Sequence, residues 1–213
     1  MADALVPTLL REAGTTYAEE AGIRLKDQPA PLFRLLVLAN LLSARINSSI
    51  AVAAARELFA AGGGTAAGMA KLSWQDRVDA LGRGGYVRYD ESTSTRLGRM
   101  AQQVIDDYGG DLRKLAKEAD GDAGRLREAL RRFPGIGPTG ADIFCREAQA
   151  VWPWLGPYLD KVTIDGARRV GLPTTTGRLA RTVDRGDLDR LAAALTRVAR
   201  DKKLADKVTA AAK

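Results

Sequence analysis

The chain has 213 residues, enough for one domain of ordinary size or two small ones, with no histidine and one cysteine, Cys145. This composition excludes Ser-His-Asp and Cys-His triads, zinc fingers, intrachain disulfides and four-cysteine iron–sulfur clusters. The formal net charge of +7 lies entirely in residues 161–213, where 13 basic side chains outnumber 6 acidic ones. Such a basic region indicates a polyanionic partner, most often nucleic acid, with a merely solvated surface as the alternative.

The first residues show no targeting signal. They read MADALVPTLLREAG, which is acidic early and lacks the basic-then-apolar order of a secretory signal. The longest apolar stretch, residues 35–42, is interrupted by Asn40 and is far shorter than the roughly 20 residues that cross a bilayer. We therefore expect a soluble, cytoplasmic protein without membrane contact.

Helical periodicity dominates the sequence up to residue 133. In a helix over residues 32–46, the residues from Leu32 to Leu42 would be apolar on nearly every face, which predicts a buried central helix with Pro31 near its first turn. Further helices are expected at about 48–61, from an N-cap at Ser73 to Ala80, and at 92–108, 111–119 and 122–133, with glycines between several of them. Only residues 86–89 alternate as a strand would. The expected fold class is all-α.

Residues 126–144 carry the most informative pattern. A helix leads into Phe133-Pro134-Gly135-Ile136-Gly137, and a second helix begins at about Pro138. The two glycines allow a tight turn and a close approach of the backbone to a ligand, while Ile136 can anchor the turn in the core. Free backbone N–H groups at the start of the second helix would favour an anion such as a DNA phosphate. A plain corner between two helices is the alternative.

This segment resembles the helix-hairpin-helix of the base-excision DNA glycosylases, the HhH-GPD superfamily of endonuclease III and 3-methyladenine DNA glycosylase II. Leu41-Leu42-Ser43-Ala44-Arg45 resembles the family's Leu-Leu-Ser-Ala-Gln. Residues 160–172 resemble the segment that begins with the family's catalytic aspartate and ends in Arg-Leu-Gly-Leu. Thr139 precedes Asp160 by 21 residues, close to the family's spacing. Together these matches cover roughly residues 30–172.

The resemblance implies a two-lobed, all-α fold. Residues 30–144 would form a central six-helix bundle that ends in the helix-hairpin-helix. Residues 1–29 and 145–213 would form a second helical lobe, which carries the candidate catalytic aspartate and the basic C-terminal region. The family's iron–sulfur loop is missing, because no cysteine follows Cys145. We therefore expect no iron–sulfur cluster, no metal and no other cofactor, and a monomer.

The resemblance also implies an activity, that of a base-excision-repair DNA glycosylase. Such an enzyme flips a damaged base out of double-stranded DNA and hydrolyses its N-glycosidic bond, at the nucleoid. Bifunctional members have a lysine where this chain has Thr139, which cannot form their covalent adduct, so the resemblance implies a monofunctional enzyme; an alkylated base is the favoured lesion. Two alternatives are a non-catalytic helix-hairpin-helix DNA-binding protein and a bifunctional glycosylase and AP lyase that uses another amine, such as Lys161.

By the same resemblance, Asp160 is the candidate catalytic carboxylate, which would stabilise an oxocarbenium-like transition state. Asp142 and Asp165 compete for that role; their alternatives are a solvent-facing carboxylate and a helix N-cap. Arg45 takes the place of the family's intercalating glutamine and would fill the gap left by the flipped base, with Asn47 beside it. Thr139 could line the pocket or cap the second hairpin helix.

Three sets of residues complete the expected site. The DNA-binding hairpin would consist of Pro134, Gly135, Ile136, Gly137, Thr139 and Gly140. The base pocket would use Trp152, Trp154 and Tyr158, which could instead pack against the core. Phosphate contacts are expected from Arg178, Arg181, Arg185, Lys202 and Lys203.

Overall fold

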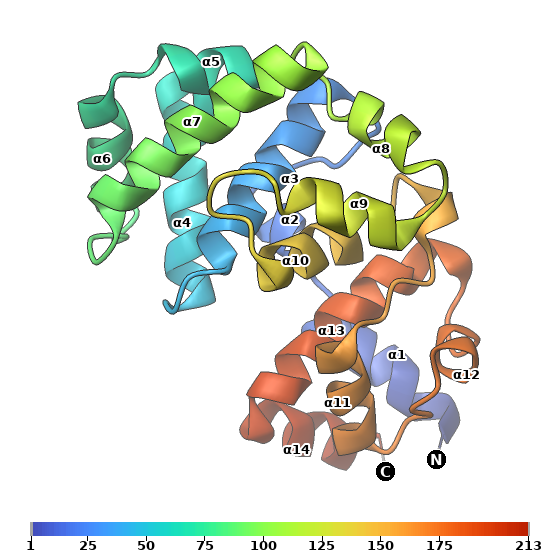
Figure 1. Ribbon diagram of the computed structural model, residues 1–213. Coiled ribbons are helices and arrows are strands. Elements are labelled where there is room, and N and C mark those ends of the chain that lie inside the picture. Colours follow the sequence, from blue (N-terminus) through green and yellow to red (C-terminus); the bar gives the residue numbers. More distant parts are fainter. Residues whose placement is uncertain (1, 213) are drawn as a thin grey trace. The chain divides into compact units, whose positions relative to one another are not determined.

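The computed structural model describes residues 2–212, with side chains from Ala4 onwards, and within this range the chain is helical and forms no strand (Figure 1). The all-α fold class is therefore confirmed. Residues 86–89 form no strand: Tyr86 is buried while Val87 and Arg88 are exposed, and the described chain offers no second strand with which this segment could pair.

The chain divides into two compact units. The middle unit is Ala18–Cys145, and the terminal unit combines the residues up to Tyr17 with those from Arg146 onwards. These divisions lie at 17/18 and 145/146, where the sequence expectation placed 29/30 and 144/145. Helix α10 (Pro138–Ala148) begins in the middle unit, and its last residues belong to the terminal unit.

The middle unit is built around α3. Its helices are α2 (Tyr17–Glu20) apart from Tyr17, α3 (Pro29–Leu42), α4 (Ser48–Leu58), the π-helix η1 (Phe59–Gly63), α5 (Ala66–Lys71), α6 (Trp74–Arg83), α7 (Asp90–Tyr108), α8 (Arg113–Ala119), α9 (Ala123–Leu130) and the start of α10. Every residue of α3 from Leu35 to Leu41 is buried, which confirms the predicted central helix. It ends at Leu42 rather than near residue 46, and the side chain of Asn47 then caps α4.

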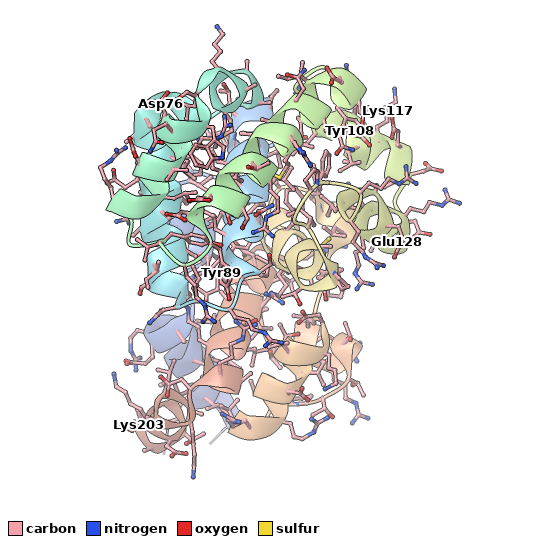
Figure 2. The ribbon with its side chains drawn as sticks, turned by 60° about the vertical axis from the view of Figure 1, so that its left-hand side comes forward. Asp76, Tyr89, Tyr108, Lys117, Glu128 and Lys203 are labelled. Carbon is pink, nitrogen blue, oxygen red and sulfur yellow. The ribbon has the colours of Figure 1, made fainter. Side chains whose placement is uncertain are left out.

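Local signals fix several other helix ends. Ser73 and Asp76 form a capping box at the start of α6, so the predicted N-cap is confirmed, although the helix continues to Arg83 (Asp76 is labelled in Figure 2). Gly109 closes α7 in the left-handed conformation, with φ of 62°. The helix expected at about residues 48–61 is α4 to Leu58 and continues as η1 to Gly63, and Gly62 has φ of 102° inside η1.

Arg77 ties three helices of the middle unit together. Its side chain is buried, and its guanidinium donates hydrogen bonds to the carbonyl oxygens of Met69, Leu72 and Ser94. Burial lowers the pKa of this guanidinium. Because carbonyl oxygens satisfy its donors, Arg77 serves the packing of α5, α6 and α7.

The terminal unit is built around α13. Its elements are α1 (Ala2–Ala13), the 3-10 turn η2 (Pro153–Leu155), α11 (Lys161–Val170), α12 (Thr176–Ala180), the 3-10 turn η3 (Arg185–Asp187), α13 (Leu188–Arg200) and α14 (Lys202–Ala211). Helices α1, α11 and α14 all pack on α13. The core includes Leu9 of α1 and Leu191 and Leu195 of α13, so both ends of the sequence build this one unit.

Candidate functional site

The predicted hairpin joins α9 to α10 in the middle unit. Phe133 and Ile136 are buried, and the Ile136 N–H donates to the Phe133 carbonyl oxygen at 3.0 Å. Gly135 has φ of +81°, and a Cβ there would lie 2.6 Å from Nδ2 of Asn40. This position therefore requires glycine for both its backbone conformation and the space around it.

Asn40 holds the hairpin from α3. Its Nδ2 donates to the carbonyl oxygen of Pro134 at 2.9 Å, and the residue is only 4% exposed. Sequence reasoning missed this role, although the signal was present: Asn40 is the one polar residue in the apolar run 35–42. A buried amide needs a partner, and here that partner is the hairpin backbone.

A cavity of about 300 Å³ lies beside the hairpin, lined by Asn40, Ser43, Ala44, Tyr86, Arg96, Gly135, Gly137, Pro138, Thr139 and Gly140. Arg96 supplies its positive charge. One nitrogen, Nη2, donates to the hydroxyl oxygens of Ser92 and Thr93 at 3.2 and 3.0 Å, and Arg96 forms no ion pair within the described chain. Hydroxyls, an arginine and the start of α10 line the cavity, and no carboxylate does, so its chemistry suits an anion. Nothing in the sequence distinguished Arg96 from the other arginines.

Thr139 is the second residue of α10 and is exposed where it lines this cavity. Its hydroxyl makes no hydrogen bond to another described side chain or backbone group, so the capping role considered for it is not observed. The position is open to a ligand.

Arg45 and Asn47 lie in the turn between α3 and α4. Arg45 is exposed and forms no ion pair within residues 2–212. Asn47 is exposed too, but its Oδ1 accepts the Ser49 N–H at 3.0 Å and caps α4. Of the two expected gap-filling residues, Arg45 is thus the one whose polar end is not engaged locally.

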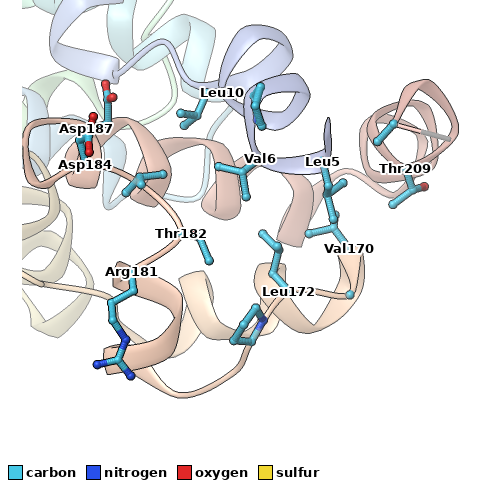
Figure 3. Close-up of a pocket in the computed structure, with 15 residues that line it drawn as sticks. Leu5, Val6, Leu10, Val170, Leu172, Arg181, Thr182, Asp184, Asp187 and Thr209 are labelled. Atoms are coloured by element: carbon cyan, nitrogen blue, oxygen red, sulfur yellow. The ribbon is translucent and has the colours of Figure 1, made fainter. Parts of the chain in front are cut away.

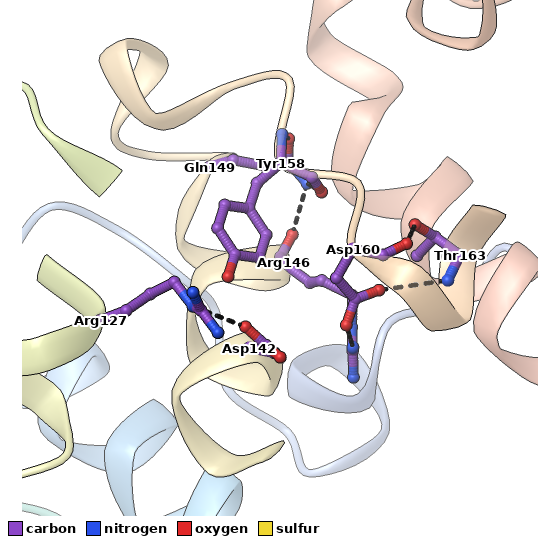
Figure 4. A network of polar contacts seen from close by, with 7 residues as sticks. All are labelled: Arg127, Asp142, Arg146, Gln149, Tyr158, Asp160 and Thr163. Atoms are coloured by element: carbon purple, nitrogen blue, oxygen red, sulfur yellow. Dashed lines mark hydrogen bonds and ion pairs between the residues drawn. The ribbon is translucent and has the colours of Figure 1, made fainter. Parts of the chain in front are cut away.

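Asp160 lies in the terminal unit as the N-cap of α11. Its Oδ1 accepts the Thr163 N–H at 3.1 Å, and its Oδ2 accepts a hydrogen bond from Nη1 of Arg146 at 2.5 Å (Figure 4). The side chains of Asp160 and Arg146 are 10% and 7% exposed. The ion pair is therefore largely removed from water, and the carboxylate is held at both oxygens.

The two competing carboxylates are more exposed. Asp142 is 21% exposed at its side chain and pairs with Arg127 at 2.8 Å, so it is not the freely solvated group considered in the sequence analysis. Asp165 is 41% exposed and pairs with Arg168 and Lys161. Hydrogen bonds from these two side chains lower the pKa of Asp165. It lies inside α11, so the N-cap role considered for it was wrong and belongs to Asp160.

Two residues near the end of α10 support the segment before Asp160, and sequence reasoning missed both. Oε1 of Gln149 accepts the Tyr158 N–H at 2.9 Å, and Nε2 donates to the Tyr158 carbonyl oxygen at 3.2 Å (Figure 4). Arg146 supplies the ion pair to Asp160 itself. The available signal was polar residues among apolar ones in Ile-Phe-Cys-Arg-Glu-Ala-Gln-Ala, and both side chains are buried.

The expected base-pocket aromatics differ in exposure. Trp152 is 3% exposed and packs into the core, as the alternative proposed, whereas Trp154 is 37% exposed. Their rings are stacked, with centroids 6.0 Å apart and an interplanar angle of 18°. Tyr158 is half-buried. Of the three, Trp154 has the most surface for stacking on a ligand.

The five expected phosphate-binding residues are exposed and fall into two groups. Arg178, Arg181 and Arg185 precede α13, and Lys202 and Lys203 follow it at the start of α14 (Lys203 is labelled in Figure 2). Arg181 also lines a cavity of about 1020 Å³ whose walls include Val6, Leu10 and Leu172 (Figure 3). That cavity is mainly apolar and contains no other expected site residue.

Among residues 2–212, no group of cysteine or acidic side chains is arranged to hold a metal ion. None of the described helices has the length and apolar character needed to cross a membrane.

Comparisons with known proteins place the fold. No protein-family model and no curated protein matches the sequence. Among solved structures, the chain is similar to endonuclease III in a trapped covalent intermediate with DNA, an estranged-adenine complex. The two are 13% identical, with a TM-score of 0.50 over 93% of this chain and 86% of that chain. The all-helical fold is therefore that of endonuclease III, as the sequence resemblance predicted.

Proposed function

We propose that this protein is a monofunctional DNA glycosylase of base-excision repair, which binds duplex DNA as a monomer and hydrolyses the N-glycosidic bond of a damaged base. The observation that carries the proposal is the hairpin: an endonuclease III-like fold presents Gly135 and Gly137 beside a cavity that contains donors and no carboxylate. The similar solved structure is itself a protein–DNA complex. Such an enzyme would act in the cytoplasm, at the nucleoid.

DNA binding would begin at the hairpin. Backbone N–H groups at the start of α10 attract a phosphate through hydrogen bonds and the helix dipole, without reading sequence. Asn40 keeps the turn in its conformation, and Arg96 adds positive charge to the cavity. Arg45, exposed in the turn after α3, would enter the stack when the damaged base leaves it.

Asp160 would serve the chemical step. As the bond between base and sugar lengthens, positive charge builds on the sugar, and a fixed carboxylate stabilises it. The base leaves with the bonding electrons, and a water adds to C1′ while the Asp160 carboxylate takes up its proton. Thr139 has no amine to replace that water, so the product is an abasic site on an intact strand. Alkylated bases, which are electron-poor, are the favoured class of lesion, with Trp154 as a stacking surface.

The test uses duplexes that each carry one lesion, namely 3-methyladenine, hypoxanthine, uracil or an oxidised base. We expect the wild-type protein to release a base from at least one duplex. Asp160→Asn should lose release by at least about 100-fold while it still binds DNA. Asp165→Asn is the matched control, since it removes an exposed carboxylate from the same helix, and it should keep wild-type activity.

A non-catalytic DNA-binding protein is the second candidate, because the bonds of Asp160 to Thr163 and Arg146 also serve a purely structural role. In that case the wild-type protein would bind damaged duplexes and release no base from any of them. A lyase that uses Lys161 is the third candidate; this amine is exposed and pairs with Asp165. Borohydride trapping on abasic DNA would reveal its covalent adduct, and we expect none.

A further inference from the structure

We propose that Arg146 is a positioning residue for the hydrolysis, acting through Asp160. This inference rests on the proposed function, because it concerns the carboxylate assigned to the chemical step. It assigns Arg146 a role that is exerted on the carboxylate of Asp160 rather than on the substrate. The observations that support this role are hydrogen bonds within the terminal unit.

The Asp160 carboxylate is fixed from two directions. Thr163 N–H binds Oδ1 and the Arg146 guanidinium binds Oδ2, so rotation of the carboxylate would break one or both bonds. The backbone of Asp160 is fixed as well, because its carbonyl oxygen accepts the Thr163 hydroxyl at 2.7 Å and the Ile164 N–H at 3.0 Å. The two bonds to the carboxylate therefore also fix the orientation of its remaining lone pairs.

The chain before Asp160 is held by the same helix end. Gln149 binds both the N–H and the carbonyl oxygen of Tyr158, as a neighbouring strand would, and its Nε2 also donates to the Arg146 carbonyl oxygen at 2.8 Å. Arg146 and Gln149 are each 6% exposed. The end of α10 thus holds the Asp160 side chain through Arg146 and the backbone before Asp160 through Gln149.

This arrangement suits a fixed negative charge. A carboxylate that is already oriented stabilises developing positive charge without reorganisation at the moment of reaction. The positive guanidinium of Arg146 offsets part of the stabilisation that Asp160 gives to the developing positive charge. Without Arg146, however, a largely buried carboxylate would be unpaired and free to turn towards water. We expect the benefit of a fixed Asp160 carboxylate to outweigh the opposing charge of Arg146, because a misplacement of a catalytic group by about 1 Å costs about 100-fold in rate.

The experiment measures single-turnover base release at saturating protein, with the dissociation constant for the same duplex measured separately. Arg146→Met should lower the rate about 100-fold and Arg146→Lys about tenfold, since lysine keeps the charge but not the planar geometry of the guanidinium. Both should bind DNA within about twofold of wild type, so that the loss falls on the chemical step. Arg168→Met, which removes one of the two exposed partners of Asp165 on α11, is the matched control and should react at the wild-type rate.

Folding is followed by thermal unfolding, because removal of Arg146 leaves Asp160 without its charge partner. If Arg146→Met does not fold, Arg146→Lys carries the test. A wild-type rate in any folded Arg146 variant would overturn the positioning role, and so would a loss confined to DNA affinity. If the wild-type protein releases no base from any duplex, the proposed function itself is wrong, an outcome distinct from both of these.

Discussion

Asn40 of α3 donates its side-chain amide to the carbonyl oxygen of Pro134, 94 positions further along the chain, at 2.9 Å. The same amide nitrogen lies where a Cβ on Gly135 would come within 2.6 Å. One buried side chain therefore satisfies the hairpin backbone and limits what can occupy its turn. The central helix α3 therefore helps to hold the hairpin in its conformation.

Replacement of Asn40 by alanine should affect both stability and DNA binding. The partly buried Pro134 carbonyl oxygen would lose its partner, which lowers the free energy of unfolding by about 1–3 kcal/mol, and the loosened turn should weaken DNA binding. Ser73→Ala is the control, since it removes the cap of α6 at a cost of about 1 kcal/mol without contact to the hairpin. Denaturant unfolding and titration with duplex DNA would show whether only Asn40→Ala loses affinity; equal affinities would contradict the role of Asn40.

Gly135→Ala should destabilise the middle unit where Gly137→Ala does not. An alanine at 135 would adopt φ of +81°, a left-handed conformation that costs about 1–2 kcal/mol, and would also displace Asn40. At Gly137 an added Cβ meets nothing within 4 Å and φ is not positive. Unfolding free energies of the two variants test this difference, and equal values would show that the turn relaxes without cost.

Local patterns in the sequence predicted the features that depend on residues close together in the chain, such as helices and their ends. The apolar run of α3, the cap at Ser73 and the glycine that closes α7 are examples. The hairpin was found by its glycines and by resemblance. The partners of Asn40 and Asp160 were not predicted, because a buried polar side chain shows that it needs a partner and does not show which one.

The aromatics and capping residues illustrate the same limit. Trp152 and Trp154 are two positions apart, yet one is buried and the other exposed, a difference set by the packing of the loop rather than by residue type. Either Asp160 or Asp165 could have capped α11. The choice followed from where the helix begins, which is among the least certain features of a single sequence.

Thr139→Lys should create a covalent activity that the wild-type protein lacks. Thr139 is exposed and lines the cavity beside the hairpin, so a lysine there fits without disturbing the core. If this position faces the sugar, the new amine should form an adduct with abasic DNA that borohydride traps. Thr139→Met is the control for side-chain bulk. Active base release by the wild type, with no trapped adduct from Thr139→Lys, would show that residue 139 does not reach the sugar.

Gly166→Ala should destabilise the terminal unit. Gly166 of α11 lies against the backbone of α13, where an added Cβ would overlap the carbonyl oxygen of Leu195. The two helices would have to separate, at a cost of about 1–3 kcal/mol or more, as for other overpacked cores. Gly177→Ala on α12 is the control, because its Cβ would meet nothing within 4 Å. Thermal unfolding should show a lower midpoint for Gly166→Ala alone, and a wild-type midpoint would mean that α11 and α13 part easily.

The salt dependence of DNA binding should show which basic residues contact phosphates. The Arg178/Arg181 pair precedes α13 and the Lys202/Lys203 pair follows it, so the two pairs can be tested separately. Each lost phosphate contact lowers the magnitude of the negative slope of log affinity against log salt by about 0.9, and double replacement by glutamine in either pair should therefore lower that magnitude by about 2. Lys207→Gln is the control, because Lys207 already pairs with Glu12 at 2.6 Å and, with Arg11, lowers the pKa of that carboxyl. A pair whose replacement leaves the slope at the wild-type value belongs to a solvated surface, and its share of the +7 charge has no part in DNA binding.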